Sequence, residues 1–317
     1  MKRWLIVVVA LVALAVAGGG AWAAFARSGG GSGATHPQAS SSPSGGQSSS
    51  GTSSAGSPST GVPSASPSPR VSLIALPAGV GRFAAAAAPR MVAGPRDKPV
   101  PILMYHLIGD PPAGEPYPDL FVSLLDFASQ MRYLEGHGFT AVTLTQLAAF
   151  WHGTGKLSAK PVVLSFDDGY RSDWRAAAPI LQRIGWPGVL NLCMNAVHAH
   201  GDLPVPLVHG LVRAGWEIDD HTLTHPDLTT LDAAGLHREI VVSRAVLQAL
   251  SGEPVSFFCY PSGRYDATVV AAVKAAGFVG ATTTDVGLAT PTDLFTLARV
   301  RVHRAMSLAA FAHSLAH

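Results

Sequence analysis

From Pro99 to the C-terminus, short apolar runs alternate with amphipathic segments. The short runs are expected to be buried strands, near residues 100–105, 162–166, 189–194, 216–218, 255–260, 278–281 and 297–302. Between them lie segments with apolar residues at helical spacing, near residues 124–136, 173–184, 207–214, 232–250, 267–276 and from 307 onwards. Repeated strand–helix units of this kind predict parallel strands covered by helices. The expected fold class is α/β, a barrel or a doubly wound sheet, with the chemistry at the carboxyl ends of the strands.

The first 27 residues have the pattern of an export segment. Lys2 and Arg3 precede an uncharged stretch from Trp4 to Ala26. Its apolar part from Leu5 to Ala17, followed by small residues, is typical of a signal peptide. The whole stretch is also long enough for one membrane span of about 20 residues, with the basic end in the cytoplasm. We therefore expect residues 1–27 to be a signal peptide or a membrane anchor, and the rest of the chain to be extracellular, anchored or secreted.

A long polar stretch follows. Residues 28–69 are almost entirely Ser, Gly, Pro, Ala and Thr, and they lack the apolar side chains that offset the entropy of folding. Residues 70–98 are ambiguous, because they can pack on the edge of a domain or extend the linker. The expected organisation is a disordered linker over residues 28–98 and a single domain over residues 99–317.

Charge and cysteine content limit the possible partners and the possible disulfide bonds. The 22 basic and 20 acidic residues leave a formal net charge of +2, which argues against a nucleic-acid partner because such proteins need a concentrated basic face. The two cysteines, Cys193 and Cys259, both lie in apolar runs. This placement favours buried free thiols over a disulfide.

Two adjacent carboxylates, Asp167 and Asp168, follow the apolar run at 162–166. Carboxylates at the end of a buried strand are costly unless they are paired or bound to a metal ion. Gly169 permits a tight turn that lets neighbouring side chains point at one site. One aspartate is readily explained as a helix N-cap or a turn residue, but a pair is explained less well in that way.

Two histidines, His221 and His225, follow the strand expected at 216–218. Histidines four residues apart fall on one face of a helical turn, close enough to bind one cation. Because the chain has 13 histidines, the pair is a weak signal by itself. Together with Asp168 it forms a set of two histidines and a carboxylate, which leaves open positions for water and substrate.

Two further strand ends carry candidate residues. Pro261 and Gly263 flank Ser262, so the backbone N–H of Ser262 can point at a developing oxyanion, although an ordinary strand-ending turn is the alternative. His106 ends the first expected strand and would place a group of near-neutral pKa beside the other candidate residues, at the carboxyl ends of the strands. Taken alone, His106 is more simply explained as an edge histidine.

These motifs together resemble those of the polysaccharide deacetylase family, the carbohydrate esterases with NodB homology. The resemblance extends from about Pro99 to the C-terminus. Residues 165–169 resemble the first motif of that family, T/S-F-D-D-G, and residues 221–225 resemble the second, H-S/T-x-x-H. Residues 260–263 resemble the third, Y-P-Y-G or R-x-P-Y-G, with Ser262 in place of the commoner tyrosine.

The resemblance implies a distorted (β/α) barrel of the NodB-homology type with parallel strands, and a deacetylase catalytic domain over residues 99–317. It implies that Asp167 is the catalytic base and that Asp168, His221 and His225 bind a divalent metal ion. The implied cation is Zn²⁺, with Co²⁺, Ni²⁺ or Mn²⁺ as alternatives. The implied partner is an acetylated polysaccharide, with membrane contact only through an uncleaved N-terminal segment, and the protein is expected to be a monomer.

The sequence departs from the family pattern in informative places. The arginine that often steadies the base is missing from the third motif, where Cys259 and Tyr260 stand instead. The aspartate–tryptophan motif is not visible near residues 282–287, and the late Leu-x-His acid is not clear, although His303 lies in that region. These departures are similar to those of poly-N-acetylglucosamine deacetylases, in which a first-strand Met-Tyr-His supplies the general acid. The resemblance therefore favours His106 over His303 as the acid.

The function implied by the resemblance is metal-dependent removal of N-acetyl groups from an N-acetylglucosamine-containing extracellular polysaccharide or peptidoglycan. In that reaction the backbone N–H of Ser262 would stabilise the oxyanion. Two alternatives remain open: an esterase acting on O-acetyl groups of a glycan such as xylan, and a catalytically silent glycan-binding domain. Retention of both aspartates and both histidines argues against the silent domain.

Overall fold

The computed structural model describes residues 75–76, 78, 80, 83, 91–92, 96–198 and 203–316. The expected export segment at residues 1–27 and the Ser/Gly/Pro-rich part of the expected linker lie outside these residues. Within the described part of the chain, no helix combines the length and the apolar character that crossing a membrane requires.

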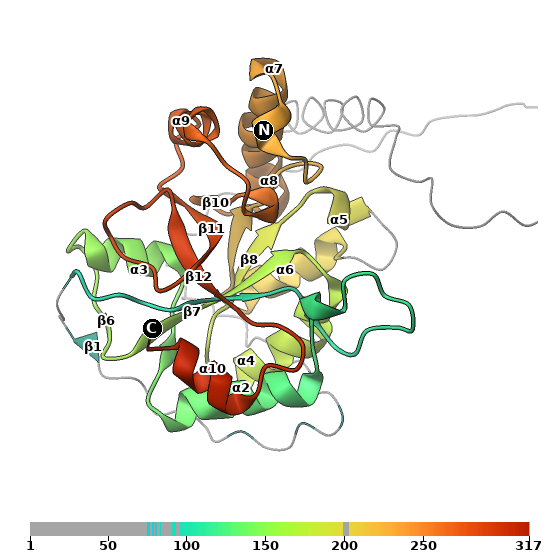
Figure 1. Ribbon diagram of the computed structural model, residues 1–317, viewed down its shortest axis with the longest axis vertical. Coiled ribbons are helices and arrows are strands. Elements are labelled where there is room, and N and C mark those ends of the chain that lie inside the picture. The colour runs from blue at the N-terminus through green and yellow to red at the C-terminus, as the bar shows by residue number, and fades with distance from the viewer. Residues whose placement is uncertain are drawn as a thin grey trace, which may run out of the picture. The chain divides into compact units, whose positions relative to one another are not determined.

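Seven parallel strands form a closed barrel (Figure 1). Their order is β2, β12, β11, β10, β9, β8 and β7, and pairing between β7 and β2 closes the ring. The strands are β2 Ile102–Tyr105, β7 Pro161–Asp168, β8 Val189–Leu192, β9 Glu217–Asp220, β10 Phe257–Cys259, β11 Gly280–Val286 and β12 Leu297–Arg301. The expected (β/α) barrel with parallel strands is confirmed, and the doubly wound sheet is excluded because the ring closes.

Shorter strands flank the barrel. β5 Thr140–Ala141 adds to the first residues of β7 in parallel. The remaining pairs are β3 Leu107–Ile108 with β4 Phe121–Val122, which are parallel, and β1 Met91–Val92 with β6 Leu157–Ser158, which are antiparallel.

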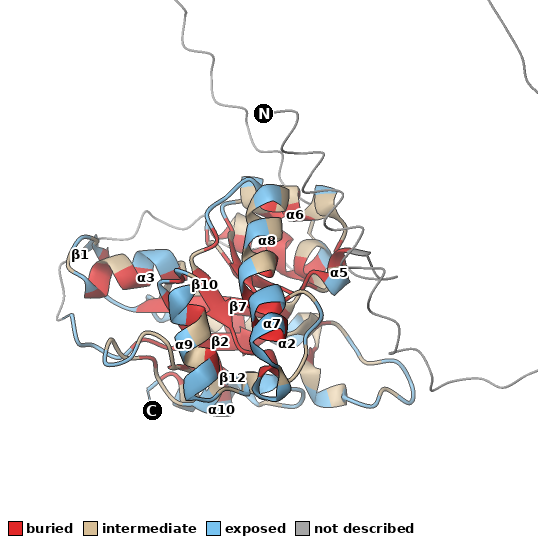
Figure 2. Ribbon diagram, turned by 90° about the horizontal axis from the view of Figure 1, so that it is seen from above, coloured by how far each residue is buried: buried red, intermediate tan, exposed pale blue. Residues whose placement is uncertain are grey.

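Helices surround the barrel, and Figure 2 shows that the buried positions gather on the strands while the helices expose their outer faces. The α-helices are α2 Leu124–Gly136, α3 Leu144–Trp151, α4 Ala178–Arg183, α5 Asn195–His198, α6 Val205–Arg213, α7 Ala233–Leu236, α8 Ser243–Ser251, α9 Ala267–Ala275 and α10 Leu308–Ser314. Short 3₁₀ segments are η1 Pro118–Leu120, η3 Leu228–Thr230 and η5 Pro261–Gly263, and π-helical segments are η2 Asp173–Ala177 and η4 His237–Val242.

Aromatic packing holds the ends of β2 and β7 in place. The Tyr105 and Phe166 rings stack with their centroids 5.4 Å apart, and Phe127 of α2 meets Tyr105 edge-on at 5.2 Å. Buried aromatic pairs of this kind contribute about 0.5–1.5 kcal/mol beyond their area. The residues that follow these two rings, His106 and Asp167, are therefore presented from a rigid edge.

The helix expected over residues 232–250 is present, but it contains a π-helical segment that its sequence did not predict. The segment, η4, lies between α7 and α8, and within it Glu239 is buried. One extra residue in a helical turn disturbs the apolar spacing only locally, so periodicity does not reveal it. The helix ends as expected, at Gly252 in the left-handed conformation with a φ of 76°.

The described residues before Pro99 pack on the barrel domain. Val80 is buried in the main apolar cluster, with Phe83 packed against that cluster. Arg132 of α2 donates a hydrogen bond to the Val80 carbonyl, and its guanidinium lies 4.8 Å from the centre of the Phe83 ring. For the described residues of the stretch 70–98, these contacts favour packing on the edge of the domain over an extension of the linker.

Candidate active site

The paired aspartates lie where β7 leaves the barrel. Asp168 has a φ of 75° and Gly169 a φ of 95°, so two successive residues adopt the left-handed conformation. A Cβ on residue 169 would lie 2.3 Å from the Leu192 Cδ1, which explains the glycine. Left-handed backbone costs a non-glycine residue free energy and persists where the surroundings impose it, as they do at functional sites.

Asp168 meets both histidines of the second motif. Its Oδ1 lies 3.4 Å from the His221 Nε2 and 3.6 Å from the His225 Nε2, and the three ligand atoms lie within 4.8 Å of one another. Ligand atoms about 2.0–2.2 Å from a tetrahedral Zn²⁺ are roughly 3.3–3.6 Å apart. The donor set and its spacing therefore fit one divalent cation, as expected from the sequence.

The backbone of the third motif orients His221. The His221 Nδ1 lies 2.8 Å from the Cys259 carbonyl oxygen, which can only accept a hydrogen bond. Nδ1 therefore carries a proton, which leaves Nε2, the nitrogen that faces Asp168, as the atom that can bind a cation when it is deprotonated. A carbonyl partner of this kind fixes the ring and the tautomer of a metal-binding histidine.

The two histidines do not lie on a helical turn, and that expectation was wrong. Residues 221–225 form an irregular loop in which Thr222 and His225 have φ values of 70° and 58°. A helical turn would pair the N–H of His225 with the His221 carbonyl, but the Thr222 hydroxyl accepts that N–H instead, at 2.9 Å. Side-chain carboxylates hold the rest of the loop: Asp220 binds the N–H of Thr222, and Glu239 binds those of Leu223 and Thr224. The two imidazoles still converge, with ring centroids 4.8 Å apart.

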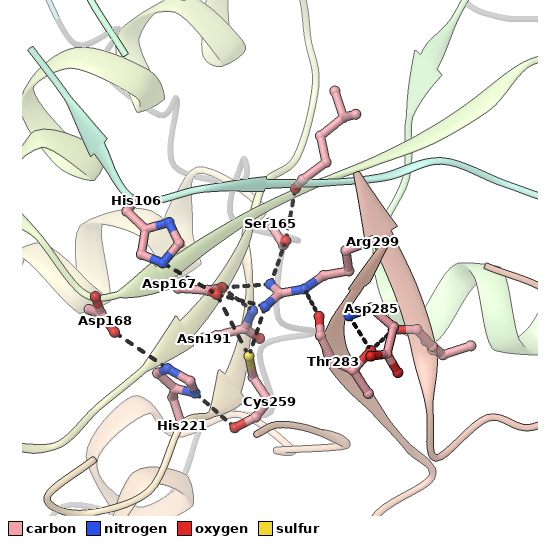
Figure 3. Close-up of polar contacts among 12 residues, drawn as sticks. His106, Ser165, Asp167, Asp168, Asn191, His221, Cys259, Thr283, Asp285 and Arg299 are labelled. Carbon is pink, nitrogen blue, oxygen red and sulfur yellow. Dashed lines mark hydrogen bonds and ion pairs between the residues drawn. The ribbon is translucent and has the colours of Figure 1, made fainter. Parts of the chain in front are cut away.

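Asp167 points the other way, into the barrel, where it meets Arg299 of β12 (Figure 3). The guanidinium makes two parallel hydrogen bonds of 2.8 Å to the carboxylate, and the Asn191 amide donates a third of 2.7 Å. Burial would raise the pKa of Asp167, but the Arg299 charge and its hydrogen bonds outweigh burial and hold that pKa well below its usual range. Asp167 is therefore ionised at every pH at which His221 and His225 are neutral.

Sequence reasoning missed Arg299 and Asn191. Both lie inside strands and are buried, and each is recognisable only through its contact with Asp167. The available signal was a pair of arginines, Arg299 and Arg301, within an otherwise apolar strand, in a chain whose third motif lacks its arginine.

The structure separates the two candidate acids. The His106 Nε2 lies 3.9 Å from the Asp167 Oδ2, and His106 is largely buried (Figure 3). Burial lowers the pKa of His106, and the charges of Asp167 and Asp168 oppose that fall. His303 is exposed, and its Nδ1 lies 2.8 Å from the carbonyl oxygen of Arg304. The geometry thus brings His106, and not His303, to the carboxylates.

Ser262 lies on η5, the turn directly after β10. It has a φ of 53°, and it is the fourth left-handed non-glycine residue in the loops that carry the motifs, with Asp168, Thr222 and His225. Gly263 follows with a φ of 67°, and a Cβ there would overlap the Thr284 side chain. The turn is therefore fixed by its backbone, and the tyrosine common at position 262 in the family is not needed to form it.

Cation binding is expected to weaken in two stages as the pH falls. Burial alone would lower the pKa of His221, but Cys259 and Asp168 raise it well above its usual value, whereas burial and the neighbouring His221 lower the pKa of His225. A cation binds only the neutral rings, so Kd should rise about tenfold per pH unit below the His221 pKa and about a hundredfold below that of His225. Titration calorimetry with Zn²⁺ between about pH 5 and 8 measures both slopes, and a Kd that does not change with pH would contradict the site.

Comparison with known proteins places the chain in a family. The sequence pattern of the polysaccharide deacetylase family matches residues 154–281. Among solved structures, the Bacillus anthracis protein BA0330, assigned to the polysaccharide deacetylases, is 31% identical, with a TM-score of 0.62 and coverage of 69% of each chain. The Bacillus subtilis (strain 168) protein YxkH, with the same assignment, is 27% identical over 213 residues, 67% of this chain and 74% of that protein.

A shorter match adds a relative whose reaction is named. The poly-β-1,6-N-acetyl-D-glucosamine N-deacetylase of Escherichia coli K12 is 33% identical over 87 residues, which are 27% of this chain and 13% of the E. coli protein. The family pattern over residues 154–281 includes Asp167, Asp168, His221 and His225, whereas His106 and Arg299 lie outside it. The likeness to BA0330 extends over more than two thirds of both chains, and the barrel and the motif residues agree with it. The chain therefore belongs to the polysaccharide deacetylase family.

Proposed function

We propose that the protein is a metal-dependent hydrolase that removes N-acetyl groups from an N-acetylglucosamine-containing polysaccharide outside the cytoplasm. The proposal depends on one observation. At one end of the barrel, three residues that can bind a single cation, Asp168, His221 and His225, lie beside two residues that can transfer protons, Asp167 and His106. The name of the E. coli relative supports the N-acetyl substrate, although that protein matches only a quarter of this chain.

Asp168, His221 and His225 would hold the cation, and Zn²⁺ suits a set of two imidazoles and one carboxylate. When bound there, the cation would supply Lewis acidity towards an acetamide carbonyl and lower the pKa of a water molecule. Because Cys259 fixes the His221 ring and Glu239 fixes the loop that carries His225, the protein sets the position of the ligands in advance.

Asp167 is the general base of the proposed reaction, and it accepts the proton of the attacking water. Arg299 and Asn191 hold the carboxylate ionised and in one orientation, so its remaining lone pair, on Oδ2, is fixed relative to Asp168. A base held in place in this way need not reorganise as the water attacks.

His106 is the general acid and donates its proton to the nitrogen of the leaving amine. Burial lowers the pKa of His106, and the negative charge of Asp167, 3.9 Å from the ring, opposes that fall and so helps the imidazole to carry the proton. The backbone N–H of Ser262, on the turn after β10, donates to the oxyanion that develops on the acetyl carbonyl. Acetate and a free amino sugar are the products.

Substitution of the two candidate acids separates their roles. His106→Ala is expected to lower kcat by about 10²–10³-fold, because the leaving amine then departs without a proton. His303→Ala is the matched control, and it should leave kcat within about twofold because its side chain is exposed and bonded to local backbone. Loss of activity on substitution of His303 instead would overturn the assignment of His106.

Acetate release from the full-length protein tests the function as a whole. With Zn²⁺ present, we expect turnover of β-1,6- or β-1,4-linked N-acetylglucosamine oligomers, and slower or no turnover of O-acetylated xylan. Preference for the O-acetyl esters would identify the chain as an esterase of the same scaffold. Oligomer binding without acetate release, with any divalent cation, would refute the hydrolase.

A further inference from the structure

Arg299 reaches Asp167 from a strand other than the one that carries the third motif. Around the barrel, β12 lies two strands from β7 by way of β2, whereas β10 lies three strands away by way of β8 and β9. Arg299 is 1% exposed and Asp167 is 2% exposed, so the guanidinium crosses the barrel interior to form this ion pair.

Every N–H of the Arg299 guanidinium has an acceptor. Nε donates to the Thr283 carbonyl at 2.6 Å. Nη1 donates to the Asp167 Oδ1 at 2.8 Å and the Ser165 Oγ at 3.2 Å, and Nη2 donates to the Asp167 Oδ2 at 2.8 Å and the Cys259 Sγ at 3.4 Å. All five donors of this buried guanidinium are satisfied, two of them by one carboxylate, so the position holds an arginine without leaving an unpaired N–H.

The third-motif position is filled by the small side chain of Cys259. Its sulfur lies 3.4 Å from the Arg299 Nη2 and 3.8 Å from the Asp167 Oδ2, and the residue is fully buried (Figure 3). A long side chain at position 259 would enter the volume that the Arg299 guanidinium occupies. The Cys259 backbone serves the His221 ring at the same time, so the chain cannot move away to make room.

We infer that the barrel has one guanidinium position beside its base, that Arg299 fills it in this chain, and that the small residue at position 259 makes this possible. Arg299 is a positioning residue: it acts through Asp167 and touches no substrate. Residues 259 and 299 are consequently coupled, and the arginine can be supplied from either β10 or β12 but not from both. The catalytic part of the inference rests on the proposed function, whereas the coupling does not.

The kinetic test compares the full-length protein with Arg299→Met, with Arg299→Ala and with the exchange variant Cys259→Arg/Arg299→Ala. Arg299→Met should lower kcat by roughly 10²-fold with little change in KM, because a displaced base affects the transition state more than substrate binding. The exchange variant should recover at least about tenfold over Arg299→Ala. Arg301→Met, an exposed arginine on the same strand, is the matched control and should behave as the unaltered protein.

A thermal test works even without an assay. Cys259→Arg alone places two guanidinium groups in one buried volume and should lower the unfolding midpoint by roughly 10 °C or more, and the exchange variant should regain much of that loss. In a double-mutant cycle, Asp167→Asn and Arg299→Met should each destabilise, while the double variant should be more stable than their sum predicts.

The kinetic and thermal measurements distinguish failure of the proposed function from failure of the shared guanidinium position. Absence of deacetylase activity in the unaltered protein, with the thermal coupling present, would refute the proposed function and leave the shared guanidinium position standing. An exchange variant no better than Arg299→Ala, in kcat and in midpoint, would overturn the inference. So would an Arg299→Met variant with an unchanged kcat.

Discussion

Asp167→Asn is expected to lower kcat by about 10²–10⁴-fold, the range in which general-base catalysis contributes. The amide oxygen can still accept one hydrogen bond from Arg299, but it cannot take a proton from water. Zn²⁺ affinity should stay within about threefold, because Asp168 and the two histidines supply the ligands. Acetate release at saturating substrate, with calorimetric Zn²⁺ titration of the same sample, measures both quantities.

Substitution of the neighbouring aspartate, Asp168, is expected to have a different effect from that of Asp167→Asn. Asp168→Asn should weaken Zn²⁺ binding as well as activity. Asp119→Asn, a change at an exposed aspartate on the 3₁₀ segment η1, should affect neither. Since Asp167→Asn leaves a buried guanidinium without its counter-charge, it should also lower the unfolding midpoint. Full activity in Asp167→Asn would remove the base from the mechanism.

Loss of the cation is expected to abolish activity and part of the stability together. His225→Ala should reduce kcat by at least about 10³-fold at cation concentrations that saturate the unaltered protein. At 100 times Kd, a bound cation stabilises a folded protein by about 2.7 kcal/mol, and the variant should lose most of that stabilisation. Scanning calorimetry with and without Zn²⁺ measures the loss.

His225 suits this experiment because its side chain is 37% exposed, so alanine there should leave the fold intact without metal. His221 is buried and bonded to the Cys259 carbonyl, and its removal would confound the two effects. His152→Ala, an exposed histidine at the end of α3, is the matched control. Undiminished acetate release after exhaustive chelation, with no cation-dependent shift in midpoint, would refute metal dependence.

The features that the sequence predicted correctly are local ones. The buried strands were visible as short apolar runs, and the chemistry-bearing residues were visible because they interrupt the pattern where a strand ends. Asp168, His221 and His225 could be assigned to one site because parallel strands in a barrel present their carboxyl ends at the same mouth. The roles of these residues remain predictions for the experiments above.

The features that the sequence did not predict depend on partners distant in the chain. Arg299 and Asp167 are 132 residues apart, and neither strand marks the other as its partner. The loop at residues 221–225 contains left-handed backbone, and it is held by Glu239, which accepts the N–H groups of Leu223 and Thr224 from 16 and 15 residues further along the chain. The four-residue spacing of the histidines suggested a helical turn, but threonine side chains and tertiary hydrogen bonds favour the irregular loop.

Because Glu239 lies in the π-helical segment η4, its position relative to the loop at residues 221–225 depends on the number of residues in that segment. Each residue of a helix contributes about 100° of rotation and 1.5 Å of rise. Deleting one residue within η4 would restore regular α-helical hydrogen bonding while swinging the Glu239 carboxylate away from the N–H groups of Leu223 and Thr224. A deletion that improves the helix would therefore release the loop that carries His225, so insertions and deletions here should be far less tolerated than substitutions.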